Sequence, residues 1–334
     1  MKIAVFSSKS YDEEYFINAN TSKGFVFDFI EAPLDPRSAK WTKDYDAVCA
    51  FVNDDLGRDT LTELRSCGIR LVALRCAGFN HVDLHAAREL GIKIMRVPAY
   101  SPNAVAEHAV ALILTLARKT HKSYNRVRDA NFSLERLVGF NISGKRVGVI
   151  GTGKIGQVFA GIMQGFGCIV IAYDPYPSEQ MEKQGITYTT LKKLFQLSDI
   201  ISLHCPLVPE THRIINEESL SWMKKGAMLI NTSRGKLIHT PDVIHSLREK
   251  HLGYLGIDVY SEEEKLFFRD LSERIIDDEA IMQLISFPNV LITSHQGFLT
   301  HEALIEIAET TLKNISDFRD QKSSENEVTP LLIN

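Results

Sequence analysis

At 334 residues the chain is too long for one ordinary hydrophobic core, and we predict about two domains. Hydrophobic residues make up 44% and charged residues 24%, a composition typical of globular proteins that fold without stabilising disulfides or metal sites. The net charge of −4 argues against a broad nucleic-acid surface, and no apolar run approaches the roughly 18 residues of a membrane span. We therefore expect neither nucleic acid nor a membrane among its partners.

Two further features predict a cytoplasmic protein. The five cysteines are odd in number and scattered, which favours reduced, buried thiols over a disulfide framework or a metal site. The apolar start, residues 1–6, is too short for a signal sequence and reads better as a first β-strand. We expect no bound metal.

Strand-like and helix-like runs alternate along the first hundred residues. Short strands are predicted at residues 3–6, 25–29, 47–51, 71–74 and 93–97, and helices at 59–67 and 82–90. Alternation of this kind is typical of a parallel sheet covered by helices. The first hundred residues therefore predict a small α/β domain.

Two prolines, Pro98 and Pro102, then interrupt the pattern. Residues 104–119 are almost entirely apolar and predict a long helix buried on most sides, between domains or between subunits. Residues 121–140 are charged, with three aromatic side chains among them. They form either a solvated connector or an arm that faces another subunit.

The alternation resumes at Gly144. Six strands are predicted at residues 147–150, 169–173, 200–204, 227–231, 254–258 and 290–293, enough for a six-stranded doubly wound sheet. An amphipathic helix over residues 301–318 follows, and we expect it to return to the first domain. This predicts a discontinuous domain of residues 1–101 and 299–334, with residues 102–298 inserted as a second domain.

The first strand of the second half ends in glycines spaced G-x-G-x-x-G, at Gly151, Gly153 and Gly156. They would permit a tight turn, close approach of a pyrophosphate, and close packing of the next helix, whose N-terminus attracts phosphate. Glycines alone also suit a generic turn of a parallel sheet. Here the next strand ends in Asp174, 23 residues after Gly151, near the spacing at which an acid binds a ribose. The combination predicts a dinucleotide, and a carboxylate that repels a 2′-phosphate predicts NAD over NADP.

Polar residues follow three strands beyond the glycines, at the sheet edge where ligands of parallel sheets bind. They are Arg234, the glutamate run 262–264 and His295. Hydride transfer to a ketone leaves negative charge on oxygen, which a protonated histidine relieves by donating its proton. A neighbouring carboxylate favours the imidazolium, and the arginine fork suits a substrate carboxylate and can polarise the carbonyl. Each also has an ordinary interpretation: a turn arginine, a solvated charge run, a histidine bonded to its loop. The pattern does not choose among the three glutamates.

At these residues the chain resembles the D-isomer-specific 2-hydroxyacid dehydrogenases, and looks most like their fermentative D-lactate branch. The motifs are Arg75-Cys-Ala-Gly-Phe-Asn80, Val97-Pro-Ala-Tyr-Ser-Pro-Asn-Ala-Val-Ala-Glu-His108, Gly151-Thr-Gly-Lys-Ile-Gly156, Asp174-Pro-Tyr-Pro177, Leu203-His-Cys-Pro206, Asn231-Thr-Ser-Arg-Gly235, Asp258-Val-Tyr260 and His295-Gln-Gly-Phe298. The resemblance implies two doubly wound parallel-sheet domains, a Rossmann NAD-binding domain inserted in a smaller flavodoxin-like catalytic domain. It also implies a homodimer or homotetramer that reduces pyruvate to D-lactate with NADH, reversibly.

The resemblance implies roles for individual residues. Arg234 matches the catalytic arginine, His295 the proton donor, and the family's spacing selects Glu263 from the glutamate run. Cofactor contacts are implied for Gly151, Gly153, Ile155, Gly156, Asp174, Cys205, Pro206, Thr211, Thr232, Ser233, Arg234 and Asp258. Substrate contacts are implied for Phe51, Ala77, Gly78, Tyr100, Arg234, His295 and Phe298.

The chain departs from the family pattern at two positions. Thr211 stands where many lactate-type relatives carry asparagine, and Ser261 replaces the usual acidic residue after Asp-Val-Tyr. Residues 265–285 resemble an insertion of the lactate-type branch, which favours pyruvate over larger keto acids. The alternatives are a dehydrogenase for another D-2-hydroxy acid, with a branched or aromatic side chain, and an NAD-sensing, corepressor-like interaction protein.

Overall fold

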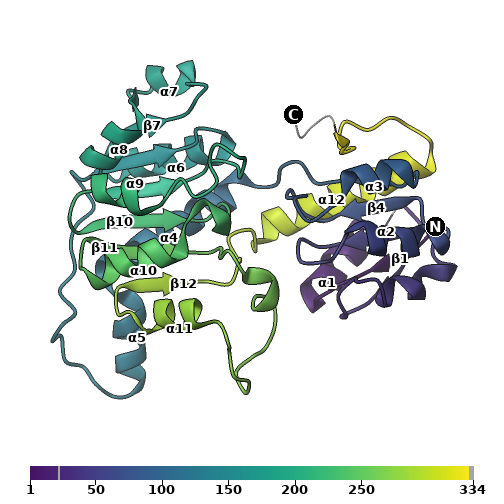
Figure 1. Cartoon of the computed structure of the whole chain (residues 1–334), viewed down its shortest axis with the longest axis horizontal. Helices are drawn as coiled ribbons and strands as arrows, with labels where there is room; N and C mark the ends of the chain where they lie inside the picture. The colour runs from purple at the N-terminus through teal and green to yellow at the C-terminus, as the bar shows by residue number, and fades with distance from the viewer. Residues whose placement is uncertain (22, 331–334) are drawn as a thin grey trace. The chain divides into compact units, whose positions relative to one another are not determined.

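The computed structural model of the chain describes residues 1–21 and 23–330. The chain divides into two compact units, unit 1 with Met1–Ser101 and Leu299–Asn334, and unit 2 with Pro102–Phe298. Each unit has a parallel sheet of its own, flanked by helices (Figure 1). The predicted α/β class with two parallel sheets is confirmed.

The sheet of unit 1 has five strands in the order β2-β1-β3-β4-β5, one of the two common doubly wound orders. The strands are β1 (Lys2–Val5), β2 (Val26–Phe29), β3 (Ala47–Ala50), β4 (Leu71–Leu74) and β5 (Lys93–Met95). The first helices are α1 (Ser10–Ala19), the 3₁₀ helix η1 (Ser38–Asp44), α2 (Arg58–Ser66) and α3 (Leu84–Glu89). Every residue of β3 and β4 is buried, as expected for parallel strands covered on both faces. All five strands predicted for this unit are confirmed.

Helix α12 (His301–Arg319) completes unit 1 after the chain leaves unit 2. It begins at Thr300, whose hydroxyl oxygen accepts a hydrogen bond from the N–H of Ala303. Its apolar stripe, with Ala308, Leu312 and Ile315, is buried in one core with β1, β3 and β4. The predicted amphipathic helix is confirmed.

The sheet of unit 2 has seven parallel strands in the order β12-β11-β10-β9-β6-β7-β8. The strands are β6 (Arg146–Ile150), β7 (Ile169–Tyr173), β8 (Thr187–Tyr188), β9 (Ile200–Leu203), β10 (Ala227–Asn231), β11 (Leu252–Ile257) and β12 (Val290–Ile292). The six predicted strands are confirmed, but the predicted number was wrong by one. The additional strand, β8, pairs with β7 over two residues, too short a run to show any periodicity.

The helices of unit 2 cover both faces of this sheet (Figure 1). They are α4 (Pro102–Arg118), α5 (Thr120–Arg128), α6 (Lys154–Gly165), α7 (Glu179–Lys183), α8 (Leu191–Leu197), α9 (Glu217–Trp222), α10 (Thr240–Arg248) and α11 (Glu279–Ser286), with 3₁₀ helices η2 (Gly235–Leu237) and η3 (Glu263–Lys265). The predicted apolar helix is α4, and its buried side packs on α6, β10 and β11 within unit 2 itself. Among the described residues, no helix is both long and apolar enough to cross a membrane.

The segment after α4 was predicted only as a connector or an arm, and the structure adds helix α5 to it. None of the residues of α5 is buried, so the sequence carries no apolar stripe that would reveal a helix. The five cysteines are all free, and four of them are buried, with Cys67 partly exposed.

Candidate active site

The glycine-rich turn joins β6 to α6 so tightly that two of its glycines cannot be replaced. Gly151 has φ +94°, and a Cβ added there would lie 2.5 Å from the backbone nitrogen of Cys205. A Cβ on Gly156 would lie 2.1 Å from the carbonyl oxygen of Gly151. These two glycines therefore let α6 pack directly on the turn.

Gly153 differs, because nothing in the protein lies within 4 Å of the position its Cβ would take. It is the N-cap of α6 and provides no side-chain cap. The first hydrogen bond of the helix runs from the Gln157 N–H to the Gly153 carbonyl, so the N–H groups of residues 154–156 have no intrahelical partner. An open, uncapped helix N-terminus fits the pyrophosphate of a dinucleotide.

Asp174 ties the end of β7 to the glycine turn. One carboxylate oxygen accepts a hydrogen bond from the Thr152 N–H at 2.7 Å, and the other accepts one from the Tyr176 N–H at 2.9 Å. Each oxygen keeps a second lone pair, so the carboxylate can also accept hydrogen bonds from ribose hydroxyls. The strand β8 supports the turn, because the Tyr188 hydroxyl donates to Thr152 Oγ1 at 2.9 Å.

The loop after β9 is held to the neighbouring strand ends. The Ser233 hydroxyl donates to the Cys205 carbonyl at 2.6 Å, which joins this loop to the end of β10. Burial raises the pKa of the Cys205 thiol to about 11, so the thiol stays neutral at physiological pH. The Thr211 hydroxyl donates to the Pro206 carbonyl at 2.6 Å and accepts from the Val208 N–H at 2.9 Å. Thr211 thus closes its own loop.

Arg234 follows β10 in a turn shaped by a buried amide. Asn231, fully buried, donates through Nδ2 to the Arg234 carbonyl at 2.8 Å and accepts from the Ser233 N–H at 3.0 Å. A Cβ on Gly235 would lie 2.1 Å from the carbonyl carbon of Tyr260, so this turn packs against the loop after β11. The Arg234 guanidinium donates to the Ser233 carbonyl at 2.7 Å, and its other N–H groups have no hydrogen-bond partner among the described residues.

The side chains of Glu263, in the loop after β11, and His295, in the loop after β12, contact each other at ion-pair distance. His295 Nδ1 lies 2.9 Å from Glu263 Oε1, and the two side chains are 17% and 16% exposed. The other oxygen of Glu263 accepts a hydrogen bond from the Tyr260 N–H at 3.0 Å, which fixes the carboxylate. Because a carboxylate only accepts, Nδ1 is the donor, and Nε2 is left to exchange a proton with a ligand.

Asp258 shapes the loop that carries His295. Its carboxylate is 1% exposed and accepts hydrogen bonds from the N–H groups of Gln296 at 2.9 Å and Gly297 at 2.8 Å. The Asp258 carbonyl accepts from the His295 N–H at 2.7 Å, and His295 has φ +53°. The loop therefore presents His295 in a left-handed conformation that the buried aspartate holds in place.

Two side chains complete this aspartate network. His108 Nε2 lies 3.2 Å from Asp258 Oδ1, and the Thr293 hydroxyl also donates to that oxygen. Burial alone would raise the pKa of Asp258, but the hydrogen bonds from His108, Thr293 and the loop outweigh it and lower the pKa. No role was predicted for His108 or Thr293. The sequence offered one indication of a role for His108, its place at the end of the motif that runs from Val97 to His108.

The predicted substrate residues of unit 1 lie on the loop after β4 and near it. The N–H groups of Ala77 and Gly78 donate no hydrogen bond within the part of the chain that the structure describes. Arg75, fully enclosed, forms an ion pair with Asp12 at 3.1 Å and lies over the ring of Phe51, 4.6 Å from its centroid. This buried ion pair anchors the start of the loop.

The structure thus brings the predicted cofactor and catalytic residues of unit 2 to one edge of its sheet, the carboxyl ends of the strands. It joins Glu263 to His295 and packs the Arg234 turn beside the loop before Glu263. The predicted substrate residues Phe51, Ala77, Gly78 and Tyr100 belong to unit 1. Phe298 is the last residue of unit 2 and is 7% exposed.

Comparisons with known proteins agree with this arrangement. The family model described as "D-isomer specific 2-hydroxyacid dehydrogenase, NAD binding domain" matches residues 110–297. The chain is 50% identical over 328 residues to D-lactate dehydrogenase of Escherichia coli (strain K12), covering 98% of this chain and 100% of the relative. It is 51% identical to a 2-hydroxyacid dehydrogenase homolog of Zymomonas mobilis, covering 95% of this chain and 96% of the relative.

Solved structures resemble the chain over its whole length. One, titled as the identification of the pyruvate reductase of Chlamydomonas reinhardtii, superposes with a TM-score of 0.93 at 44% identity, covering 98% of each chain. The apo-structure of D-lactate dehydrogenase from Escherichia coli gives a TM-score of 0.91 at 48% identity, covering 98% of this chain and 100% of that one. Residues 110–297 therefore form an NAD-binding domain, and the chain belongs to the D-isomer-specific 2-hydroxyacid dehydrogenases, a family of NAD-dependent enzymes.

Proposed function

We propose that the chain reduces pyruvate to D-lactate with NADH, in a reversible reaction. The observation that carries the proposal is the Glu263–His295 pair, 2.9 Å apart at the carboxyl edge of an NAD-binding sheet. A histidine held by a carboxylate beside a nicotinamide suits proton donation to a carbonyl that accepts a hydride. The lactate and pyruvate in the names of relatives at 44–50% identity support the choice of substrate.

Each side chain has one task in this mechanism. Bound NADH supplies the hydride that adds to C2 of the keto acid. His295 donates its proton to the carbonyl oxygen, which becomes the hydroxyl of the product. Glu263 stabilises the imidazolium and fixes its ring through Nδ1. Arg234, with free guanidinium donors, binds the substrate carboxylate and polarises the carbonyl.

We propose that the remaining substrate contacts come from backbone and apolar groups. The N–H groups of Ala77 and Gly78 would receive the substrate carboxylate, since they donate no hydrogen bond within the described part of the chain. Tyr100 would close over the substrate, and Phe51 and Phe298 would border its side chain. Aromatic side chains suit an apolar substituent such as the methyl group of pyruvate.

The cofactor contacts follow the strand ends of unit 2. Ile155 and Gly156 offer the unpaired N–H groups of the helix N-terminus to the pyrophosphate, and the open position at Gly153 admits it. Asp174 would bind the adenosine ribose. Smaller contacts are proposed at Gly151, Cys205, Pro206, Thr211, Thr232, Ser233 and Asp258. At Thr211 the side chain already has a partner in its own loop, and at Asp258 the side chain already has partners in the loop after β12.

We also propose that the enzyme is cytoplasmic and acts as a homodimer or homotetramer. The segment after α4 exposes Tyr124, Phe132, Leu134 and Val138, which are 62%, 75%, 79% and 84% exposed. Large apolar side chains gathered on one segment are typical of an interaction surface, and a second copy of the chain would cover them.

The test is the loss of NADH absorbance on addition of pyruvate, compared with a panel of longer, branched and phenyl-bearing 2-keto acids. We expect the highest kcat/KM for pyruvate, and in the reverse direction oxidation of D-lactate but not L-lactate. A higher kcat/KM for a branched or aromatic keto acid would assign the chain to another D-2-hydroxy acid. NADH binding without turnover on any keto acid would favour an NAD-sensing interaction protein.

A further inference from the structure

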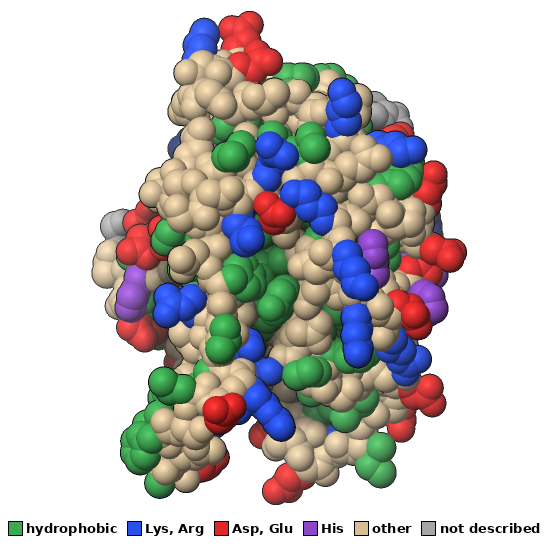
Figure 2. Space-filling view, turned by 90° about the vertical axis from the view of Figure 1, so that its left-hand side faces the viewer, with side chains coloured by type: hydrophobic (Ala, Val, Ile, Leu, Met, Phe, Trp, Pro, Cys, Tyr) green, Lys and Arg blue, Asp and Glu red, His purple; other side chains and the backbone are tan. Residues whose placement is uncertain are grey.

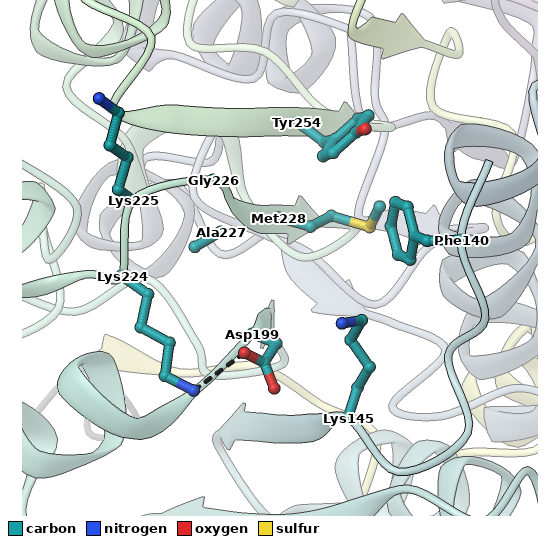
Figure 3. A pocket seen from close by; sticks show the side chains of 9 residues that line it. All are labelled: Phe140, Lys145, Asp199, Lys224, Lys225, Gly226, Ala227, Met228 and Tyr254. Atoms are coloured by element: carbon teal, nitrogen blue, oxygen red, sulfur yellow. Dashed lines mark hydrogen bonds and ion pairs between the residues drawn. The ribbon is translucent and has the colours of Figure 1, made fainter. Parts of the chain in front are cut away.

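A cavity lies in unit 2 at the edge of the sheet where the strands begin, opposite the edge that carries the glycine-rich turn. It has a volume of about 630 Å³, and its neutral lining comes from Leu116, Gly226, Gly253, Tyr254, Pro288 and Asn289. Gly226 and Tyr254 also line a smaller neighbouring cavity of about 210 Å³ (Figure 3). The wall is firm, because the Asn289 side chain donates to the Gly253 carbonyl at 2.7 Å and a Cβ on Gly253 would lie 2.4 Å from the Gly226 carbonyl oxygen.

Apart from Tyr254, the ionisable side chains in the described lining of the large cavity are all basic. They are Lys119, His121, Lys122, Arg126 and Arg136, and no aspartate or glutamate is part of that lining. Within the described residues, none of these lysines and arginines forms an ion pair with a carboxylate. We call the large cavity, with these five side chains in its lining, the basic cavity.

Most of these cations are held in place by backbone carbonyls. Lys119 Nζ donates to the Arg136 carbonyl at 3.0 Å, Arg126 donates to the Glu135 carbonyl at 2.6 Å, and Lys122 donates to the Pro288 carbonyl. Arg136 is exposed, and its guanidinium has no hydrogen-bond partner among the described residues. Neutral carbonyls position these charges without cancelling them.

The positive charge continues into the smaller cavity. Lys145, Lys224 and Lys225 line it, and its only carboxylate, Asp199, is bonded to Lys224 at 2.9 Å (Figure 3). In the view of Figure 2, Lys and Arg side chains surround a hollow whose floor is apolar. An excess of positive charge in a chain whose net charge is −4 marks this edge as distinct from the rest of the surface.

Burial and, after it, the crowding of like charges disfavour the protonated forms of Lys122 and His121. Burial, then Lys119 and Arg126, lower the pKa of Lys122, and burial, then Lys122, lower the pKa of His121. A bound anion would remove this repulsion and would gain charge-assisted hydrogen bonds from several side chains at once.

We propose that the basic cavity binds a small polyanion that carries two or more phosphate or carboxylate groups. One such group would lie among Lys119, Lys122 and Arg136, and a second would reach the lysines of the smaller cavity. This is a second ligand site, on the edge of the sheet opposite the glycine-rich turn.

The test is calorimetric titration of the full chain with inorganic pyrophosphate in the presence of saturating NADH, which occupies the pyrophosphate site at the glycine-rich turn. We expect one site per chain. Inorganic phosphate, with a single charged group, should bind more weakly, and titration with a simple tricarboxylate distinguishes a phosphate site from a carboxylate site.

The variant that removes two of the charges, Lys122→Gln with Arg136→Gln, should weaken pyrophosphate binding at least about tenfold. The matched control is Lys183→Gln with Arg213→Gln, since Arg213, like Arg136, is an exposed arginine with positive φ, 55° against 65°. The control should bind pyrophosphate as the parent does. Arg136→Glu, a single change on an exposed side chain, should abolish binding even if the double variant folds poorly.

Two results would overturn the proposal. The first is the absence of a pyrophosphate site when NADH is bound, with no binding of phosphate or of the tricarboxylate either. The second is equal affinity in the parent and in Arg136→Glu, and a changed sedimentation coefficient in that variant would then assign these cations to a contact between subunits.

Discussion

At the scale of the residue, the proposed chemistry depends on a carboxylate that has two partners. Glu263 accepts the Tyr260 N–H with one oxygen and faces His295 Nδ1 with the other, so its orientation does not depend on substrate. Arg234 differs, because one N–H of its guanidinium is bonded and the others have no partner among the residues that the structure describes, so they can bind a ligand. A fixed carboxylate and an available guanidinium suit the separate tasks of holding the proton donor and binding the substrate.

The first prediction concerns Glu263→Gln. The amide keeps the shape of the side chain but removes the carboxylate that faces His295 Nδ1, so the ring loses the charge-assisted hydrogen bond that fixes it. We expect kcat for pyruvate reduction to fall about 100-fold or more, with little change in NADH binding. The measurements are kcat for NADH oxidation and an NADH titration, and a parental kcat would remove Glu263 from this role.

The second prediction concerns Arg234→Lys. Lysine keeps the positive charge but loses the planar fork, so it binds a carboxylate as a point charge only. We expect kcat/KM for pyruvate to fall at least about 100-fold, the loss of a bidentate interaction worth about 3 kcal/mol, while NADH binding changes little. Steady-state kinetics and NADH titration measure the two effects, and near-normal turnover would exclude Arg234 from the site.

At the scale of the element, the glycine-rich turn shows which glycines the fold requires and which the ligand requires. Gly151 and Gly156 have no room for a Cβ, because α6 lies directly against the turn. Gly153 has room on the protein side, so the need for glycine there comes from whatever approaches the helix N-terminus. The same three residues of one motif therefore serve two different purposes.

The third prediction separates these purposes with two single variants. Gly156→Ala should lower the free energy of unfolding by about 1–3 kcal/mol, because its Cβ would meet the Gly151 carbonyl and α6 must shift. Gly153→Ala should unfold at nearly the parental denaturant concentration but bind NADH about tenfold more weakly. Urea unfolding and NADH titration of both variants measure this, and equal losses of stability would contradict it.

The fourth prediction follows from the end of β9. Burial lowers the pKa of His204 to about 3, while the unfolded value is near 6.5. Between these values the unfolded chain binds a proton that the folded chain does not, so stability falls as pH is lowered through this window and is unaffected by His204 above it. On going from about pH 7.5 to pH 5, His204→Gln should lose about 2 kcal/mol less unfolding free energy than the parent. Urea titrations at both pH values test this, and parallel losses would contradict it.

At the scale of the whole molecule, α12 makes unit 1 discontinuous and the segment after α4 exposes apolar side chains. Helix α12 packs on α1 and β4, so the last part of the chain contributes to the core that the first part begins. Phe132, Leu134 and Val138 contribute nothing to the core of unit 2, since each is at least 75% exposed. Their exposure is the structural reason for proposing an oligomer.

The fifth prediction is that Phe132→Ser with Leu134→Ser shifts the protein to a smaller species in sedimentation velocity, because the subunit contact loses its apolar anchors. The control is Ile275→Ser, which removes a 90% exposed isoleucine elsewhere in unit 2 and should leave the sedimentation coefficient unchanged. If the double variant sediments as the parent does, this segment is not the subunit contact.

Much of the fold could be predicted because parallel strands buried on both faces are continuous apolar runs. The fully buried strands β3, β4, β9 and β10 were found this way. The edge strands β2 and β12 have no buried residue and were predicted from short apolar runs. Helix α5 and strand β8 were not, since α5 has no buried residue and β8 has only two residues. A helix without an apolar face, or a strand too short to show a period, gives no hydrophobic pattern from which it could be predicted.

The sequence by itself determined the α/β class, the dinucleotide turn and the arginine, glutamate and histidine that follow neighbouring strands. These follow from local pattern and from the rule that parallel strands end at one edge. The family resemblance selected Glu263 from the run, but only the tertiary structure brings its carboxylate to 2.9 Å from His295 Nδ1, because the two residues lie 32 positions apart and the three adjacent glutamates are equivalent in local pattern. It also joined His108 and Thr293 to Asp258, and gathered cations from α5 and the following loop around one cavity. Such contacts depend on how distant loops pack against each other, and the chemistry of a single strand end does not specify that.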